Sequence, residues 1–157
     1  NLLDGAAHFY DTYECADGKF VAIGAIEPQF YALLLEKTGL AGDPDFAAQM
    51  DPRRWPDLKA RLTEIFRTKT RDEWSAIMEG SDICFAPVLS LGEAPGHAHN
   101  VARGTFGTVD GKVQPMPAPR YSDAVLDEPR AAGDDTDALL AELGLDAAEL
   151  RAAGTVG

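Results

Sequence analysis

A single carboxylate, Glu27, closes the apolar run FVAIGAIEPQF and directly precedes Pro28. Proline suits the first turn of a helix, where its missing N–H costs no hydrogen bond, so the sequence predicts a helix that starts at Pro28 with Glu27 as its N-cap. The helix dipole there favours an ionised carboxylate, whereas burial beside Ile23 and Phe30 would favour the protonated form. Glutamate is too long to cap a helix well. Glu27 is therefore a candidate functional carboxylate, with a structural capping role as the alternative.

Two histidines, His97 and His99, form a His-x-His pair that on a strand would place both imidazoles on one side. A zinc site needs three or four ligands, and the available Asp82 and Glu93 fit no recognised spacing. No metal site is predicted.

A second candidate is Arg53-Arg54-Trp55, which could bind an anionic ligand with the Arg54 guanidinium stacked on the indole. The alternative is a pair of solvated loop charges beside a half-buried tryptophan. Cys15 and Cys84 are distant in sequence and fit neither a disulfide framework nor a zinc spacing, which is typical of a reducing, cytoplasmic protein.

Charge and length narrow the function classes. The chain has 157 residues, enough for one ordinary domain, and 14 Lys+Arg against 26 Asp+Glu give a net charge of −12. Nucleic acids and anionic membranes require clustered positive charge, so neither is an expected partner. No apolar run approaches the ~20 residues that span a bilayer. The chain begins at Asn1 without a methionine, so it reads as a piece of a longer polypeptide.

The elements around Glu27 follow from local patterns. Asp17-Gly18 between β-prone runs predicts a hairpin of residues 13–15 and 20–26, and the second strand, apolar on both faces, is expected to be buried on both sides. The helix from Pro28 should reach Thr38, because Gly39 supplies a C-cap.

Two further helices are expected. An amphipathic segment places Leu58, Leu62 and Phe66 on one face and should end near Lys69. Thr70, followed three residues later by glutamate, predicts a capping box and a third helix that reaches Gly80.

The remaining elements are short. Residues 83–89 read as a short edge strand, or as a strand broken at Pro87, that joins the hairpin, and residues 105–113 as a second hairpin around Asp110-Gly111. Residues 114–123 are proline-rich and extended. The tail from residue 134 should form two short helical runs. These elements together predict an α+β fold.

Three separated stretches of the chain carry a family resemblance. They resemble the carboxyl-terminal part of α-methylacyl-CoA racemases, within the wider family of racemases and class III CoA transferases. The stretches are LLDGAAHFYDTYECADGKFVAIGAIEPQFYALL, SDICFAPVLSLGEAPGHAHNVARGTF and PMPAPRYS.

The resemblance implies a larger two-domain protein whose two subunits interlock. In that frame residues 1–12 are a linker from the large CoA-binding domain, residues 13–115 are the small α+β domain, and residues 116–157 return as an extended segment and helical tail. An acyl-CoA thioester is the implied substrate, and coenzyme A is part of that substrate rather than a separate cofactor.

The implied reaction is a 1,1-proton transfer at the α-carbon of a 2-methylacyl-CoA. A histidine and an aspartate from the missing domain would exchange the proton, and Glu27 would hydrogen-bond the histidine. The resemblance also places Leu2, Leu3, Tyr10 and Ile26 along the apolar acyl channel; simple core packing is the alternative for these four.

Two other functions stay open. One is a class III CoA transferase, in which an aspartate of the large domain acts as a nucleophile and forms a mixed anhydride. The other is a non-catalytic dimerisation domain or proteolytic remnant. The glutamate favours the racemase, because a transferase has no need for a carboxylate that orients a histidine. With so few arginines, the chain alone is expected to bind CoA weakly.

Overall fold

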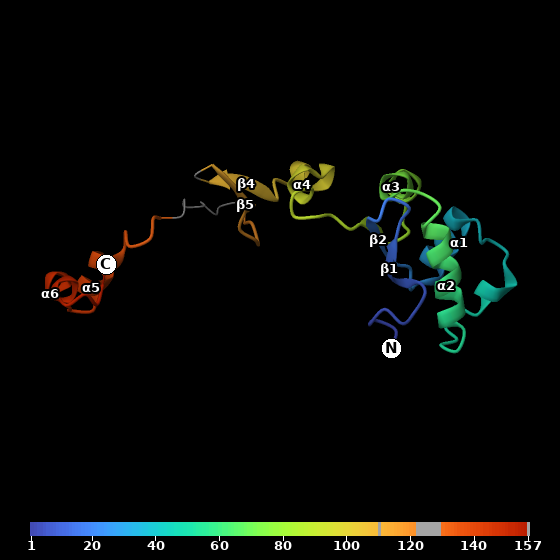
Figure 1. Ribbon diagram of the computed structural model, residues 1–157, viewed down its shortest axis with the longest axis horizontal. Helices are drawn as coiled ribbons and strands as arrows, with labels where there is room; N and C mark the ends of the chain where they lie inside the picture. Colours follow the sequence, from blue (N-terminus) through green and yellow to red (C-terminus); the bar gives the residue numbers. More distant parts are fainter. Residues whose placement is uncertain (110, 122–129, 157) are drawn as a thin grey trace. The chain divides into compact units, whose positions relative to one another are not determined.

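The computed structural model describes residues 1–109, 111–121 and 130–156 (Figure 1). The chain divides into two compact units, residues 1–93 and 94–157, and each is described by itself. The predicted boundaries at residues 12 and 115 refer to a longer parent protein and stay a prediction. Among the described residues, no helix combines the length and the apolar character needed to cross a membrane.

The centre of the first unit is a three-stranded antiparallel sheet. Strands β1 (Tyr10–Glu14) and β2 (Phe20–Gly24) form the predicted hairpin, and β3 (Phe85–Pro87) joins the other edge of β2, as expected. The hairpin turn depends on Gly18, which has a φ of 73° and donates its N–H to the Cys15 carbonyl at 3.0 Å. A side chain at this left-handed position would be strained, so the Asp-Gly signal has a direct physical cause.

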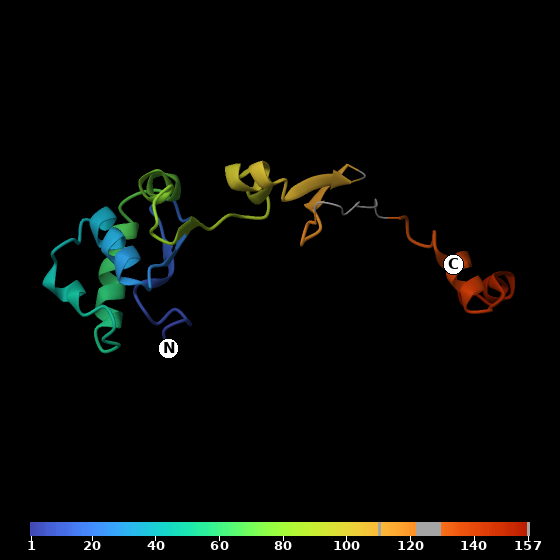
Figure 2. The same cartoon turned by 180° about the vertical axis from the view of Figure 1, so that it is seen from behind.

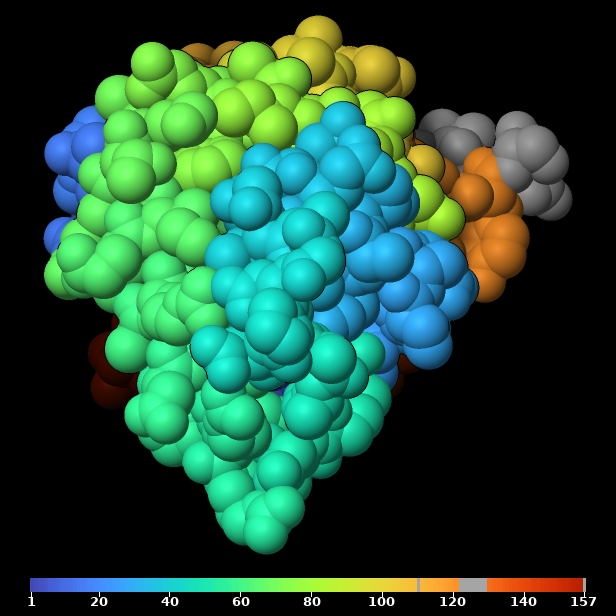
Figure 3. All heavy atoms as spheres, turned by 90° about the vertical axis from the view of Figure 1, so that its right-hand side faces the viewer, coloured from blue at the N-terminus to red at the C-terminus, as the bar shows by residue number. Residues whose placement is uncertain are grey.

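Three helices cover one side of this sheet in both ribbon views (Figures 1 and 2). From that side, the residues of α1 to α3 and their connections cover most of the blue hairpin behind them (Figure 3). The helices are α1 (Pro28–Thr38), α2 (Trp55–Phe66) and α3 (Arg71–Met78), with a short 3₁₀ turn η1 (Pro44–Ala47) between the first two.

The helix ends agree closely with the local signals. Helix α1 runs from Pro28 to Thr38, with Gly39 in the left-handed conformation as its C-cap. The capping box before α3 is complete, since Thr70 and Glu73 each bond the other's backbone N–H. Helix α2 ends at Phe66 rather than near Lys69, because a turn intervenes before the capping box begins.

The core lies between the sheet and the helices. The rings of Tyr13 and Phe66 are stacked with centroids 4.9 Å apart, and Trp74 packs edge-on against Phe66 at 5.1 Å. Val21 and Ile23 of β2 are buried on this side. The expectation that β2 is buried on both sides is wrong for this unit. Phe20, Ala22 and Gly24 face away from the core, and none of the three is buried.

The second unit contains short elements. The predicted hairpin forms from β4 (Phe106–Val109) and β5 (Lys112–Pro115), and the predicted tail helices are α5 (Thr136–Glu142) and α6 (Ala147–Ala152). A 3₁₀ turn η2 (Ala94–Gly96) and helix α4 (Ala98–Arg103) were not predicted. Of the proline-rich segment predicted at residues 114–123, Gln114 and Pro115 belong to β5 and residues 116–121 contain neither helix nor strand; residues 122 and 123 lie outside the described part.

Candidate functional site

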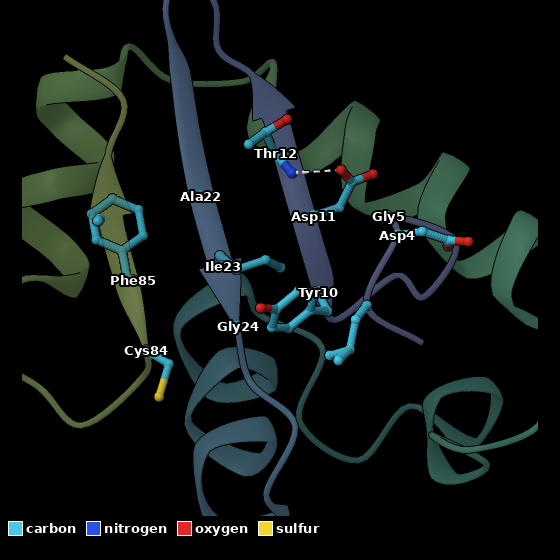
Figure 4. A pocket seen from close by; sticks show the side chains of 12 residues that line it. Asp4, Gly5, Tyr10, Asp11, Thr12, Ala22, Ile23, Gly24, Cys84 and Phe85 are labelled. Atoms are coloured by element: carbon cyan, nitrogen blue, oxygen red, sulfur yellow. Dashed lines mark hydrogen bonds between the residues drawn. The ribbon is translucent and has the colours of Figure 1, made fainter. Parts of the chain in front are cut away.

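A pocket of about 490 Å³ lies on the side of the sheet that the helices leave open (Figure 4). Its walls come from the segment before β1, from both strands of the hairpin and from the start of β3. The lining residues are Leu3, Asp4, Gly5, Tyr10, Asp11, Thr12, Ala22, Ile23, Gly24, Cys84, Phe85 and Ala86.

Small residues at matched positions create this hollow. Residues directly opposite one another in an antiparallel sheet share a face, and the register pairs Tyr10 with Gly24 and aligns Ala22 with Ala86. The Tyr10 ring lies beside Gly24, where a Cβ would make an ordinary van der Waals contact of 3.5 Å with Tyr10 Cε2. The floor of the pocket is thus formed by small residues of the sheet, and the aromatic rings of Tyr10 and Phe85 also line it.

The segment before β1 forms one wall of the pocket. The N–H of Leu3 bonds Asn1 Oδ1 at 2.8 Å, and the N–H of Ala6 bonds Asp4 Oδ1 at 3.2 Å, so the turn is held by its own residues. The Gly5 carbonyl accepts a hydrogen bond from Lys59 Nζ of α2 at 2.6 Å. The wall is therefore tied to a helix that is distant in sequence.

Glu27 occupies the predicted N-cap position of α1 with an extended backbone, φ −70° and ψ 144°. Its side chain makes no capping hydrogen bond and is exposed, and within the described residues it has no hydrogen-bond or ion-pair partner. The carbonyl of Glu27 accepts from the Tyr31 N–H at 2.9 Å, which starts the helix without the side chain. The carboxylate is thus free to bind a group that the chain does not itself supply.

The turn that carries Glu27 is held by Gln49, a residue that the sequence analysis missed. Gln49 Nε2 donates to the carbonyls of Ala25 at 3.1 Å and Ile26 at 2.9 Å, and its own carbonyl accepts from Trp55 Nε1 at 2.8 Å. A lone glutamine in a turn-rich loop gives no sequence signal for this contact. It fixes the backbone directly before Glu27.

The thiol of Cys84 lies at the edge of the pocket. Its φ of 56° is unusual for a residue other than glycine, and its carbonyl accepts the Gly24 N–H at 2.9 Å. Desolvation, and then the negative charges of Glu27 and Asp82, raise the pKa of this thiol, which keeps it protonated near neutral pH. Cys84 is thus a poor nucleophile at neutral pH.

Of the residues expected along an acyl channel, the structure brings two into the pocket. Leu3 and Tyr10 line it, whereas Leu2 and Ile26 are not among its lining residues and pack partly buried against the hydrophobic core. Glu27 also lies outside the lining, three residues beyond Gly24. The channel role of all four apolar residues stays a prediction.

His8 belongs to the core and not to the pocket. Its side chain is fully buried, Nε2 lies 2.8 Å from the Tyr31 hydroxyl, and that hydroxyl donates to the Phe46 carbonyl at 3.1 Å. Since the single Tyr31 proton is used in that bond, Nε2 must be the donor in the first, and Nδ1 has no partner among the described residues. Burial lowers the pKa of His8 to about 4, so the imidazole is neutral at pH 7.

The arginine-rich loop is not available as an anion site. Arg53 pairs with Asp51 through two nitrogens, and Arg54 pairs with Asp45 at 2.8 Å. Arg61 of α2 also pairs with this group, at Asp45. Each guanidinium pairs with a carboxylate, so in this structure the loop has the alternative arrangement, exposed charge pairs beside Trp55.

The histidine pair does not lie on a strand. His97 is the N-cap of α4 and His99 lies within its first turn, where side chains two positions apart point in different directions. Across the part of the chain that the structure describes, no three His, Cys, Asp or Glu side chains gather as metal ligands would.

Relatives of known name match most of this chain, but the match covers only part of their own length. The chain is 49% identical over 119 residues to a protein of Mus musculus named alpha-methylacyl-CoA racemase, covering 76% of this chain and 31% of that protein. It is 35% identical over 120 residues to the Caenorhabditis elegans CaiB/baiF CoA-transferase family protein ZK892.4, covering 76% and 33%. The chain therefore spans about a third of the length of these curated relatives.

Solved structures share the fold at low sequence identity. A crystal structure of Rv3272 from Mycobacterium tuberculosis superimposes with a TM-score of 0.65 at 17% identity, over 83% of this chain and 40% of that chain. The D175A mutant of Rv3272 gives the same score at 19% identity, over 86% and 40%. The sequence pattern of CoA-transferase family III matches residues 2–134. The α+β chain thus belongs to CoA-transferase family III.

Proposed function

We propose that this chain is the carboxyl-terminal part of a 2-methylacyl-CoA racemase. The observation that carries the proposal is the unused carboxylate of Glu27, held on an ordered turn beside an apolar pocket. The 49% identity to a protein named alpha-methylacyl-CoA racemase supports the same reading. The chain alone is inactive in this proposal, because the acid/base pair lies outside it.

In the proposed reaction, a base outside this chain removes the α-proton of the thioester, and an acid returns a proton to the opposite face of the enolate. Glu27 acts through a histidine: its carboxylate accepts the imidazole N–H, fixes the tautomer and stabilises the imidazolium that forms on proton abstraction. The pocket receives the acyl group, with Leu3 and Tyr10 among its apolar contacts. Leu2 and Ile26 are proposed to lie further along the same channel.

The proposal also covers the non-protein group that the reaction requires and the location and assembly of the complete protein. The only non-protein group required is the coenzyme A of the substrate, held mainly by the other domain, since the net charge of this chain is −12. The complete protein is a cytoplasmic enzyme of lipid breakdown and an interlocked homodimer, without nucleic-acid partners.

The decisive experiment measures deuterium exchange at the α-carbon of a 2-methylacyl-CoA by the full-length protein. Wild-type enzyme is expected to exchange the proton, and Glu27→Gln to slow it at least about tenfold, since each 1.36 kcal/mol of lost imidazolium stabilisation is a factor of ten. Unchanged exchange in Glu27→Gln removes the carboxylate from the mechanism.

A class III CoA transferase is the second candidate, because a Fusarium pseudograminearum relative, 29% identical over 152 residues, is named acyl-CoA transferase. Transfer of CoA from the thioester to a free carboxylic acid, without exchange of the α-proton, would establish this alternative.

A further inference from the structure

Lys59 of α2 reaches the pocket wall from the helical side of the unit. Its ammonium donates to the Gly5 carbonyl at 2.6 Å and forms an ion pair with the Asp11 carboxylate. Gly5 precedes β1 and Asp11 lies within it. One cation therefore connects α2, β1 and the segment that forms the wall.

The backbone of Gly5 and the carboxylate of Asp11 lie close together. Gly5 has a φ of 85°, and a Cβ there would lie 3.1 Å from Asp11 Oδ1, so any larger residue would be both strained and crowded. Asp11 Oδ1 also accepts the Thr12 N–H at 2.8 Å, which orients the carboxylate (Figure 4). The side chains of Lys59 and Asp11 are 35% and 19% exposed, so solvent only partly screens the pair.

The wall has few other attachments to the sheet. The bonds from the Leu3 N–H to Asn1 and from the Ala6 N–H to Asp4 shape the turn but join it to no other element. In the described structure, the Lys59–Gly5 bond is the one hydrogen bond that links residues 1–5 to another secondary-structure element. Lys59 thus adds a hydrogen bond from α2 to the packing of Leu2 against the core, and the two contacts together hold the segment that carries Leu3.

We infer that Lys59 is a positioning residue that sets acyl-group specificity: by holding Gly5 against Asp11, it fixes the pocket wall that carries Leu3. This inference rests on the proposed acyl-CoA function. A long or branched acyl group fills the pocket and touches this wall, whereas a short acyl group makes few contacts with it. Loss of the ammonium should therefore weaken binding of long acyl groups selectively.

The test uses the full-length protein with Lys59→Met, which keeps an apolar stem, and Lys59→Arg, which restores the charge. Lys37→Met is the matched control: Lys37 lies on α1, is 33% exposed and pairs only loosely with Glu36 at 3.9 Å. Rates of α-proton exchange are measured with a short and a long 2-methylacyl-CoA. Hydrogen exchange of residues 1–9 reports directly on release of the wall.

For Lys59→Met we expect KM for the long substrate to rise about tenfold and KM for the short one to change less than about twofold, with kcat for the short substrate retained. Lys59→Arg should recover most of the loss and Lys37→Met should show none. Faster hydrogen exchange at residues 1–9 should accompany the effect in Lys59→Met.

An equal loss for both substrates, or no loss at all, would overturn the inference. Its failure is distinguishable from failure of the proposed function. If the wild-type protein exchanges no α-proton, calorimetric Kd values for the same two thioesters replace the rates. A long-to-short Kd ratio unchanged by Lys59→Met would then reject the role of Lys59 independently of the reaction.

Discussion

Gln49 Nε2 lies 2.9 Å from the carbonyl oxygen of Ile26, the residue that immediately precedes Glu27. The same nitrogen also serves the Ala25 carbonyl, so one side chain orders both peptide groups at the end of β2. A carboxylate that must meet an imidazole from another domain needs a fixed backbone, since a misplacement of ~1 Å costs up to about 100-fold in rate.

Gln49→Ala is therefore expected to lower kcat for α-proton exchange several-fold with little change in KM, and to lower the free energy of unfolding by about 1–2 kcal/mol for two partly buried hydrogen bonds. Steady-state kinetics and urea unfolding measure the two effects. Gln114→Ala, which removes an amide from β5, is the control. Wild-type kcat in a destabilised Gln49→Ala would show that the contact serves stability alone.

Local signals predicted the elements that carry Glu27, because their causes lie within a few residues. Pro28 and Gly39 set the ends of α1, and Thr70 starts α3 through its own capping box. The same reasoning gave the hairpin at Gly18. Helix α4, only six residues long and without a side-chain cap, offered no comparable signal.

The pocket could not be predicted, because it depends on pairings distant in sequence. The hollow arises from the register that places Tyr10 opposite Gly24 and Ala22 opposite Ala86. Gln49 bonds residues 23 and 24 positions away, and Lys59 bonds Gly5 across 54 positions. Both faces of β2 are apolar in sequence. The sequence therefore does not distinguish the buried face from the face of small residues that is left open.

The neutral, buried His8 makes stability depend on pH. Its folded-state pKa of about 4 lies below the unfolded value of 6.5, so the unfolded chain binds the proton first as the pH falls. The contribution of neutral His8 to stability is complete above pH 6.5 and is lost progressively down to about pH 4. Linkage gives a loss of about 2 kcal/mol between pH 7 and pH 5.

Urea unfolding at these two pH values tests the assignment to His8. His8→Phe should remove most of the difference between pH 7 and pH 5, although it also removes the Tyr31 contact and lowers stability at both. The change in unfolding free energy between pH 7 and pH 5 reports the titration alone, because the lost Tyr31 contact lowers stability equally at both pH values. An equally steep pH dependence in His8→Phe would assign it to another group.

Glu93, the last residue of the first unit, forms ion pairs with Arg71 and Lys19. It accepts from Arg71 at 2.9 Å, from Lys19 at 3.1 Å and from the backbone N–H of Ser90 at 3.0 Å. These bonds, that from Arg71 first, hold the pKa of Glu93 well below its ordinary value. Arg71 is 7% exposed, so removal of Glu93 leaves a buried guanidinium whose remaining acidic partner, among the residues that the structure describes, is the exposed Asp72.

Glu93→Ala is expected to lower the urea midpoint more than the double variant Arg71→Met/Glu93→Leu, because a buried guanidinium left with an exposed carboxylate is less favourable than an apolar pair. Since the folded pKa is depressed, the contribution of this pair is present above about pH 4.5 and is lost as the pH falls below that value. Arg53→Met, which removes an exposed pair, is the control. A double variant less stable than Glu93→Ala would contradict the account.

Ala22 lies on the pocket floor in the middle of β2, opposite Thr12 and Ala86 and away from the turn that carries Glu27. Ala22→Leu should fill part of the 490 Å³ volume without moving Glu27. We expect KM for a long 2-methylacyl-CoA to rise about tenfold and kcat for a short one to be retained, since lost apolar contacts of ~1–3 kcal/mol correspond to 10–200-fold.

Ala76→Leu, on the exposed side of α3, adds the same carbons elsewhere and is the control. Unaltered kinetics with the long thioester in Ala22→Leu would place the acyl group outside this pocket, whereas equal losses with both thioesters would indicate a general distortion of the sheet.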